Sequence, residues 1–460
     1  MLEVKTFDEL TASVRGEIIQ PGDAAYDEAR KAYNAMIDKR PRVIVRCADV
    51  ADVIACVNFA RESGLTLSIK GGSHNVAGFS VCDDGLVIDL SRMKGIRVDA
   101  EQRTVRAQGG CTWGDLDHAT HPFGLHAPGG VISTTGIAGL SLGGGVGHLT
   151  RKAGLSCDNL LAADVVTTNG ELVKASAKEN ADLFWALRGG GGNFGVVTSF
   201  EFKLHPVSTV FAGPVLWGLD KARDAMRFWF QYMAKAPDDM NAFFAFLIVP
   251  PGPPFPEELH NKTVCAVVCC YTGPMEKAEE VTRPLREFGP PLLDGVGAMP
   301  FPAIQTAFDP LLPPGLLHYW KADFFKDLPD EAIEAHLKFG PAIPTVNSAV
   351  HLYPVSGAAS RVGKNDTAWS YREAQFSLVI AAVYQDAADD QANIKWVRDY
   401  WEAVHPYSAG GAYVNFMMDE GEDRVRASYR DNYDRLVKVK NKYDPGNLFH
   451  LNQNIKPTAS

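Results

Sequence analysis

The sequence lacks any long apolar run and any cluster of basic residues. No stretch reaches the roughly 18 apolar residues that a membrane-spanning helix needs, and residues 1–22 contain no apolar leader. The formal net charge is -10 at pH 7, whereas binding to a phosphate backbone requires a basic surface. We therefore expect a cytoplasmic protein that acts on small molecules and has no nucleic acid or membrane partner.

The sequence also lacks a compact cysteine framework and a complete metal-binding motif. Its eight cysteines are scattered through the chain. Three of them lie in an apolar, strand-like run without a nearby histidine: Cys265, Cys269 and Cys270. Three histidines before Pro128 have no carboxylate or cysteine at a spacing that completes a metal site: His118, His121 and His126. We expect buried thiols in the first group, a surface turn for the second, and no bound metal.

Short strands and single helices alternate in the first half of the chain. Residues 41–110 and residues 155–205 each show this alternation, which predicts two small α+β lobes joined by glycine-rich segments. Beyond Pro206 the predicted helices and strands are longer. No internal repeat is present, so a solenoid is not expected.

The C-terminal segment is expected to return to the first lobes. It reads as a helix that ends at Asp444-Pro445, followed by a polar, strand-like tail. We predict a first domain of residues 1–207 that is completed by residues 408–460, and a second domain of residues 208–407.

Glycine is concentrated in three segments. Residues 68–80 and residues 128–159 leave consecutive backbone N–H groups free of side-chain obstruction, the geometry that holds a diphosphate. Two such loops suit one large nucleotide. Residues 190–195 have G-x-G-x-x-G spacing, but they follow a predicted helix and precede a predicted strand, the reverse of a nicotinamide-binding fingerprint. There we favour a tight turn or a flavin contact.

One nucleophilic side chain lies in each of the first two glycine segments. His74 is in the first, and Cys157 is near the end of the second. An imidazole nitrogen can add to the 8α-methyl group of a flavin, and a thiolate can add to ring carbon 6. Taken alone, each residue is also compatible with an ordinary turn histidine or a buried cysteine.

With these motifs in this order, the chain resembles the berberine bridge enzyme-like branch of the vanillyl-alcohol oxidase flavoprotein family. Order and spacing agree along nearly the whole chain. The matching motifs include Gly71-Gly72-Ser73-His74-Asn75, Leu142-Gly143-Gly144-Gly145, Gly154-Leu155-x-Cys157-Asp158-Asn159, Gly191-Gly192-Asn193-Phe194-Gly195 and Tyr443-Asp444-Pro445. The family usually has arginine where this chain has Lys70, which keeps the positive charge.

The resemblance implies an α+β fold and a covalent FAD. The fold would consist of a two-lobed FAD-binding domain of the p-cresol methylhydroxylase type and a substrate domain with a large antiparallel sheet backed by helices. FAD would be attached to His74 at its 8α position and to Cys157 at ring carbon 6. The other implied FAD-binding positions are Lys70, Gly71, Gly72, Ser73, Asn75, Gly78, Gly136, Gly139, Gly143, Gly144, Gly147, Asn159, Val197, Asn452 and Asn454.

A flavin oxidase needs a base near the carbon that it oxidises. The segment Gly410–Phe416 resembles the family's Tyr-x-Asn stretch beside the flavin, which suggests Tyr413 as this base. Tyrosine has an ordinary pKa of about 10, so its phenolate requires hydrogen bonds or a cation such as Lys321. A role in packing beneath the ring or in orienting substrate remains open. The residues that the resemblance places at the substrate pocket are Tyr319, Lys321, Tyr371 and Asn415.

The implied activity is oxidation of an alcohol, amine or related C–H centre in a small organic molecule or carbohydrate. Hydride would pass to flavin N5, and O2 would be reduced to H2O2. A dehydrogenase with another electron acceptor is one alternative, because the family's oxygen access depends on small residues near the attachment cysteine and Leu160 is bulky. A carrier of flavin or metabolite without catalysis is the other. The substrate and the oligomeric state do not follow from the sequence.

Overall fold

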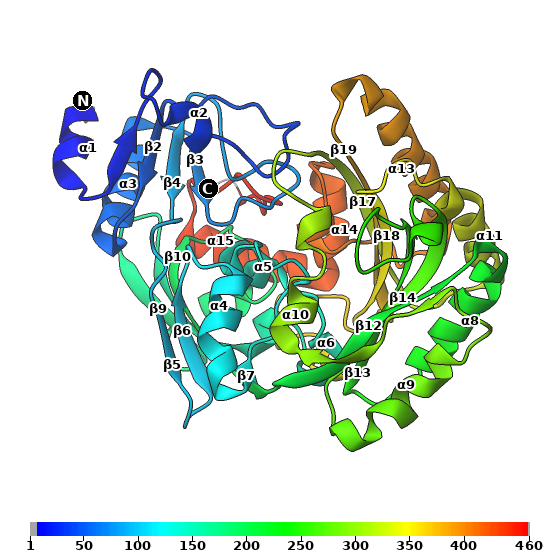
Figure 1. The fold of residues 1–460 in the computed structure, drawn as a ribbon. Helices are drawn as coiled ribbons and strands as arrows, with labels where there is room; N and C mark the ends of the chain where they lie inside the picture. Colours follow the sequence, from blue (N-terminus) through cyan, green and yellow to red (C-terminus); the bar gives the residue numbers. More distant parts are fainter. Residues whose placement is uncertain (1–6, 459–460) are drawn as a thin grey trace.

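The computed structural model describes residues 7–458 (Figure 1). A four-stranded and a five-stranded sheet form one side of the molecule, and an eight-stranded sheet forms the other. The expected α+β fold with a large antiparallel sheet backed by helices is confirmed. Within the described range, no helix has the length and apolarity needed to cross a membrane.

The first lobe is a four-stranded sheet in the order β1-β2-β4-β3. Its elements are α1 (Phe7–Ser13), β1 (Glu17–Ile19), α2 (Tyr26–Ala29), β2 (Val43–Arg46), α3 (Val50–Ser63), β3 (Leu67–Lys70) and β4 (Leu86–Asp89). The Asp49 side chain accepts hydrogen bonds from the first N–H groups of α3, and Gly64 ends that helix in the left-handed conformation. Strands β2 and β3 both run parallel to β4. The glycines of the first segment follow directly after the carboxyl end of β3.

The second lobe is a five-stranded antiparallel sheet in the order β5-β6-β10-β8-β9. Its strands are β5 (Ile96–Asp99), β6 (Thr104–Gln108), β8 (Leu160–Val166), β9 (Leu172–Ser176) and β10 (Val196–Lys203). The helices of this region are α4 (Trp113–Thr120), α5 (Ile137–Gly143), α6 (Thr150–Ala153) and α7 (Ala181–Leu187). Strands β7 (Leu125–His126) and β11 (His205–Pro206) pair beside it. The second glycine segment thus contains α5 and α6 and ends at β8.

The eight-stranded sheet follows the order β15-β12-β14-β13-β18-β19-β17, and β16 also pairs with β12. Its strands are β12 (Thr209–Trp217), β13 (Met240–Ile248), β14 (Thr263–Tyr271), β15 (Leu293–Asp294), β16 (Gly297–Pro300), β17 (Leu317–Phe325), β18 (Ala349–Pro354) and β19 (Phe376–Tyr384). The helices that follow β11 are α8 (Ala222–Met233), α9 (Ala278–Arg286), α10 (Phe301–Gln305), α11 (Asp330–Phe339), α12 (Ala358–Arg361), α13 (Asp390–Val404), α14 (Glu422–Tyr429) and α15 (Tyr433–Tyr443).

The two faces of this sheet have different neighbours. On β19, Leu378, Ile380 and Ala382 pack in one core with residues of α8, α11 and α13. Val379 and Ala381 point to the opposite face and belong to a separate core. Because side chains alternate along a strand, one face is covered by helices while the other faces the two lobes (Figure 1).

The cysteine-rich run forms β14, as expected. Cys265 and Cys269 pack against the helices, whereas Cys270 belongs to the core on the other face. Burial raises the pKa of the Cys265 and Cys269 thiols to about 12. The expectation of buried thiols is confirmed for this segment.

The histidine cluster differs from the expected surface turn. His126 is fully buried in β7, where its Nδ1 lies 2.9 Å from a carboxylate oxygen of Asp117 and its Nε2 lies 3.1 Å from Nδ1 of His121. Asp117 of α4 thus joins His121 and His126 in one chain of hydrogen bonds, whereas His118 is exposed. Among residues 7–458, no group of histidine, cysteine and acidic side chains could hold a metal ion.

The C-terminal segment packs back onto the lobes, although not as a strand. Between Asp444 and residue 458 the described backbone forms no strand, and side-chain bonds hold it instead. The buried Lys440 ammonium donates to Asp444 at 2.6 Å, to the carbonyl of Asn193 and to that of Phe449. The side chain of Asn193 in turn bonds the backbone of Gln453 and Ile455. This clamp brings the tail beside the third glycine segment.

Buried histidines predict that the protein loses stability in acid. Burial lowers the pKa of six imidazoles to about 3 or 4: His74, His148, His205, His318, His336 and His351. The unfolded chain binds protons at these groups near pH 6.5, whereas the folded chain does not. The free energy of unfolding should therefore fall as the pH decreases from about 6.5 toward about 4.

His336 offers the sharpest test of this pH dependence. It is fully buried between α11 and α13, and its Nδ1 lies 2.7 Å from the Tyr400 hydroxyl. In H336Q, the loss of unfolding free energy below pH 6.5 should be shallower by up to about 1.4 kcal/mol per pH unit. Denaturant unfolding of both proteins over this range measures the difference. Parallel stability curves would show that His336 does not contribute.

Candidate active site

A cavity of about 320 Å³ lies where the two lobes meet the uncovered face of the eight-stranded sheet. This volume is within the range of small-molecule sites in proteins. Its walls come from all three glycine segments, from strands β17, β18 and β19, and from the C-terminal tail. Elements far apart in the chain therefore converge on one site.

The first two glycine segments touch each other at the edge of this cavity. A Cβ atom on Gly72 would lie 2.3 Å from the backbone nitrogen of Gly136, and a Cβ on Gly136 would lie 2.5 Å from that of Gly72. Neither position accepts a side chain, because the obstructing atoms are backbone. Ser73 adopts a left-handed φ of 59° immediately afterwards, which turns the chain at His74. The close contact thus places His74 beside the second segment.

His74 is held on three sides. Its Nε2 lies 3.0 Å from the Thr134 hydroxyl and its Nδ1 lies 3.3 Å from the Thr135 hydroxyl. The Tyr33 ring stacks on the imidazole with the centroids 3.8 Å apart. Burial, with a smaller effect of His318, lowers the pKa of His74 to about 3. The imidazole is therefore neutral at physiological pH, the form in which its nitrogen is nucleophilic.

Tyr413 lines the cavity from the opposite segment. Its hydroxyl oxygen accepts hydrogen bonds from the backbone N–H of Gly145 at 2.8 Å and from the side-chain amide of Asn415 at 2.6 Å. Burial raises the pKa of Tyr413 above its ordinary value, and the two hydrogen bonds oppose that shift. With both acceptor positions occupied, the oxygen has one remaining hydrogen-bonding direction for its own proton or for a ligand.

The cavity is uncharged. Among residues 7–458, those that line it include no Asp, Glu, Lys or Arg. Its polar groups are backbone amides, hydroxyls, side-chain amides and neutral imidazoles. Any anionic group bound here must be held by N–H and O–H donors rather than by ion pairs.

This arrangement fits FAD. Gly139 and Gly192 line the cavity and have open space where a Cβ would be, so a ligand can approach their backbone closely. Asn452 also lines the cavity, and its Oδ1 is buried without a hydrogen-bond partner in the protein. A buried acceptor of this kind requires a donor from a ligand or water. The donor set, the close-approach glycines and the neutral His74 together suit a large nucleotide with a reactive ring.

Eleven of the residues selected from the sequence line the cavity: Gly71, Gly72, Ser73, His74, Asn75, Gly136, Gly139, Val197, Tyr413, Asn415 and Asn452. Seven of the expected FAD-binding positions do not line it: Lys70, Gly78, Gly143, Gly144, Gly147, Asn159 and Asn454. Lys70 instead donates to the carbonyls of Ala29 and Lys31. Gly143 and Gly144 lie behind the site, where a Cβ would strike Asn415 and Trp369 respectively.

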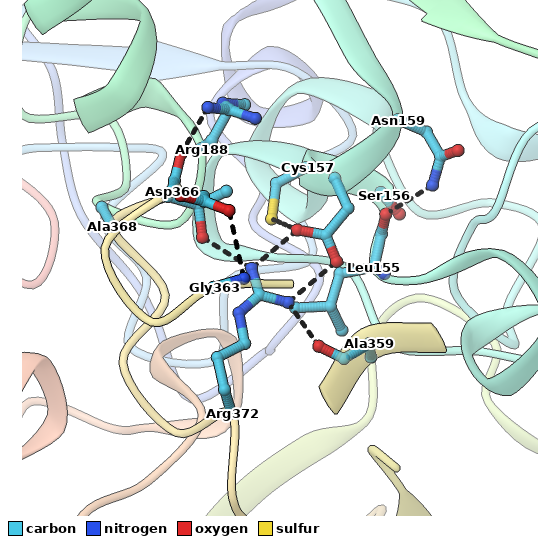
Figure 2. Close-up of polar contacts among 12 residues, drawn as sticks. Leu155, Ser156, Cys157, Asn159, Arg188, Ala359, Gly363, Asp366, Ala368 and Arg372 are labelled. Carbon is cyan, nitrogen blue, oxygen red and sulfur yellow. Dashed lines mark hydrogen bonds and ion pairs between the residues drawn. The ribbon is translucent and has the colours of Figure 1, made fainter. Parts of the chain in front are cut away.

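Cys157 is not among the residues that line the cavity, although it packs in the same core as Val146 and Tyr413, which do line it. Its side chain is fully buried, and its sulfur lies 3.7 Å from a carboxylate oxygen of Asp158 (Figure 2). That carboxylate also forms a bidentate ion pair with Arg372, with N–O distances of 2.6 and 2.9 Å. Burial and the negative charge of Asp158 raise the pKa of the thiol well above its ordinary value, so the thiolate is disfavoured.

Leu160 also lies away from the cavity. It does not line the site, and it packs in the core of the second lobe. Its bulk therefore gives no reason to prefer a dehydrogenase.

Three expected pocket residues also lie elsewhere. The Tyr319 hydroxyl accepts a bond from Arg398, and Lys321 pairs with Glu420 at 2.5 Å. Both side chains therefore point away from the cavity, whereas Trp320 between them lines it. Tyr371 packs outside the cavity, and its hydroxyl donates to the carbonyl of Ala427 at 2.9 Å. On β17 the face that carries Trp320 lines this cavity, and the face that carries Tyr319 and Lys321 does not.

Several residues that line the cavity or hold His74 were not expected from the sequence. They are Tyr33, Thr134, Thr135, Trp320, His351 and Tyr353. His351 and Tyr353 alternate with buried apolar residues on β18, and that polar alternation within an apolar strand was the available signal. Tyr33 lies in an irregular segment, and its sequence offers no comparable pattern.

Two family models match this chain. The model described as an FAD binding domain matches residues 41–176, and the model described as berberine and berberine like matches residues 412–456. These ranges contain the first two glycine segments and the Tyr413 segment. Both therefore include residues that line the cavity.

Whole-length relatives agree with these matches. An FAD-linked oxidoreductase of Dictyostelium discoideum is 32% identical over 98% of this chain and 96% of its own. The (R)-6-hydroxynicotine oxidase of Paenarthrobacter nicotinovorans is 30% identical over 97% of this chain and 98% of its own. The crystal structure of 6-hydroxy-D-nicotine oxidase from Arthrobacter nicotinovorans superposes with a TM-score of 0.87 at 26% identity, covering 99% of this chain and 100% of that one. The chain therefore belongs to the berberine bridge enzyme-like family of FAD-linked oxidoreductases, and it is an FAD-dependent enzyme.

Proposed function

We propose that this enzyme carries FAD on a single covalent bond to His74 and oxidises a C–H centre of a small organic molecule, passing the electrons to O2 to form H2O2. The observation that carries the proposal is the neutral imidazole of His74, fixed by two threonines and Tyr33 at the junction of two glycine segments. The names of two similar proteins, both nicotine oxidases, favour O2 over another acceptor.

The proposal assigns the lobes and the large sheet to different tasks. Residues 1–207 and 408–460 would bind FAD, and residues 208–407 would hold the substrate against it. This division is supported by the sheets, because the strands from β12 to β19 form one sheet that lies opposite the two lobes. Bound at the junction, FAD supplies the acceptor for a hydride from the substrate carbon.

Tyr413 is proposed to take the proton that leaves the substrate. The bonds from Gly145 and Asn415 hold its oxygen in one position and favour the phenolate, although burial opposes it. The Trp369 and Phe416 rings pack against the Tyr413 ring, with centroids 5.1 and 4.7 Å from it. These contacts restrict the side chain and exclude water from its sides.

Covalent attachment of FAD to His74 can be tested by denaturing the protein. Wild-type protein should stay yellow after denaturation, because a covalent bond survives unfolding. H74A should release its flavin on denaturation, and C157A should keep both the colour and the absorption spectrum of wild type. Precipitation in acid, followed by spectra of the pellet and the supernatant, measures all three.

Each outcome bears on a different bond. A colourless wild-type pellet from loaded protein would refute attachment to His74. A changed flavin spectrum in C157A would show that the sulfur bonds the ring in spite of its position.

The role of Tyr413 as a base can be tested by removing its hydroxyl. In Y413F the rate of anaerobic flavin reduction should fall by about 10²- to 10⁴-fold, the usual contribution of a positioned base. In wild type this rate should rise with pH through the alkaline range, because the pKa of Tyr413 lies above its ordinary value and the base is the phenolate. Stopped-flow spectroscopy across pH gives both results. A loss below about threefold, with the pH profile unchanged, would mean that Tyr413 only packs against the ring.

The electron acceptor can be identified from the reoxidation of the flavin. Flavin reduced by substrate under nitrogen should reoxidise promptly on admission of air, with one H2O2 formed per flavin. Flavin that stays reduced in air for minutes would favour the dehydrogenase. Flavin that no substrate class bleaches would favour a non-catalytic carrier.

A further inference from the structure

The half of the cavity that faces the large sheet is built from apolar side chains. Ala349 projects from β18, Val379, Ala381 and Val383 project from β19, and Trp320 projects from β17. Ala349 and Trp320 both pair with Ala381 in the sheet register, so these side chains form one continuous surface. We call it the sheet wall. Its small residues leave room that a flat ring can fill. Its apolar atoms favour contact with an apolar ring over contact with a polar, hydrated group of a ligand.

Besides the indole N–H of Trp320, which is buried without a partner in the protein, the sheet wall has one fixed polar group, the pair formed by His351 and Tyr353. The two residues alternate with buried residues on β18, so both face the cavity, and His351 Nδ1 lies 2.6 Å from the Tyr353 hydroxyl. The Phe243 ring packs against both, with centroids 5.0 and 4.8 Å away. Packing and the hydrogen bond together hold the pair in place.

This pair is neutral, and its Tyr353 oxygen has one bonding direction to offer to a ligand. Burial lowers the pKa of His351 to about 4 and raises that of Tyr353, so neither side chain is charged at neutral pH. In one tautomer the tyrosine donates to the imidazole and its oxygen can accept from a ligand. In the other the imidazole donates and the tyrosine O–H can donate to a ligand. A hydroxyl, or an amine nitrogen in its unprotonated form, can donate and accept and therefore matches both tautomers.

Charged substrates are disfavoured by the walls. No ionised side chain from the described part of the chain lines the cavity, so a carboxylate or an ammonium group would lose its hydration without gaining an ion pair. An uncharged molecule avoids that cost.

Carbohydrates are disfavoured by the small number of polar partners. In this half of the cavity the polar groups are the side chains of Asn347, His351 and Tyr353 and the indole N–H of Trp320. The Asn347 amide already donates to the carbonyl of Leu311 at 2.6 Å. A sugar carries a hydroxyl on nearly every carbon, and each hydroxyl that is buried without a partner loses its hydrogen bonds to water. Most hydroxyls of a sugar would have no partner on the sheet wall.

We propose that the substrate is an uncharged, ring-bearing molecule whose single hydroxyl or amino group bonds to the His351–Tyr353 pair while its ring packs on the sheet wall. This inference rests on the proposed function, because it assumes that the substrate occupies the space between the sheet wall and FAD. In this arrangement Tyr353 donates to the oxygen or nitrogen of that group, whose own proton passes to Tyr413 while the neighbouring carbon loses its hydride to FAD.

The test uses the flavin-loaded enzyme and four probes of known charge. Benzyl alcohol is the neutral probe, benzoate and benzylammonium carry opposite charges on the same ring, and glucose represents carbohydrates. Calorimetric titration under nitrogen at neutral pH should give a dissociation constant for benzyl alcohol that is at least about tenfold lower than for the other three. Equal or tighter binding of any of the three, or no binding of benzyl alcohol, would overturn the proposal.

A matched pair of variants locates the polar contact. Y353F should weaken benzyl alcohol by about tenfold and leave toluene, which has the same ring without the hydroxyl, unchanged. Y384F is the control, because Tyr384 lies on the neighbouring strand but faces the helices and bonds Asp390. It should change neither constant. Equal weakening of both ligands by Y353F, or no weakening of benzyl alcohol, would remove Tyr353 from the site.

The colour of the denatured protein separates this inference from the proposed function. A protein that stays yellow but binds glucose best would refute only the substrate class. A protein that loses its colour but prefers benzyl alcohol would refute only the attachment to His74.

Discussion

The contact between Gly72 and Gly136 is the constraint on which the site depends. The two backbones approach so closely that neither residue can carry a Cβ atom. This contact joins the loop after β3 to the segment before α5, and it places His74 on the hydroxyls of Thr134 and Thr135. If either glycine were replaced, the loops would have to separate and the imidazole would lose both partners. One pair of missing side chains therefore positions the proposed attachment residue.

Neutrality is the second property that unites the cavity. Its imidazoles are uncharged because burial makes protonation costly, and its phenols keep their protons for the same reason. The charged groups of this region lie behind the walls, where they hold elements together. Arg372 binds Asp158, and Arg151 donates to the carbonyls of Met240 and Ala236, which ties the second glycine segment to the large sheet. Ion pairs thus stabilise the frame while the lining remains without charge.

The C-terminal tail completes the cavity through a buried ion pair. Lys440 and Asp444 are both inaccessible to solvent, and their remaining bonds go to the backbone of the third glycine segment and of the tail. Removing one member of such a pair leaves a buried charge, which typically costs about 3–5 kcal/mol. The position of Asn452 and Gln453 at the cavity therefore depends on a contact more than 370 residues after the first glycine segment begins.

The sequence by itself determined the α+β fold, the glycine segments, and the order of the motifs that contain His74 and Tyr413, because glycine spacing and motif order are local properties of the chain. It did not determine which face of a strand meets the cavity. Tyr319, Trp320 and Lys321 alternate whichever face is buried, and only the packing of β17 between α13 and the lobes turns Trp320 inward. The same holds for Cys157, whose side chain lies beside Asp158 and Arg372 in the folded protein. It also holds for the His351–Tyr353 pair, which becomes a polar site only when β18 faces the lobes. Side-chain direction depends on the contacts of the whole molecule, and those exist only once distant segments have packed together.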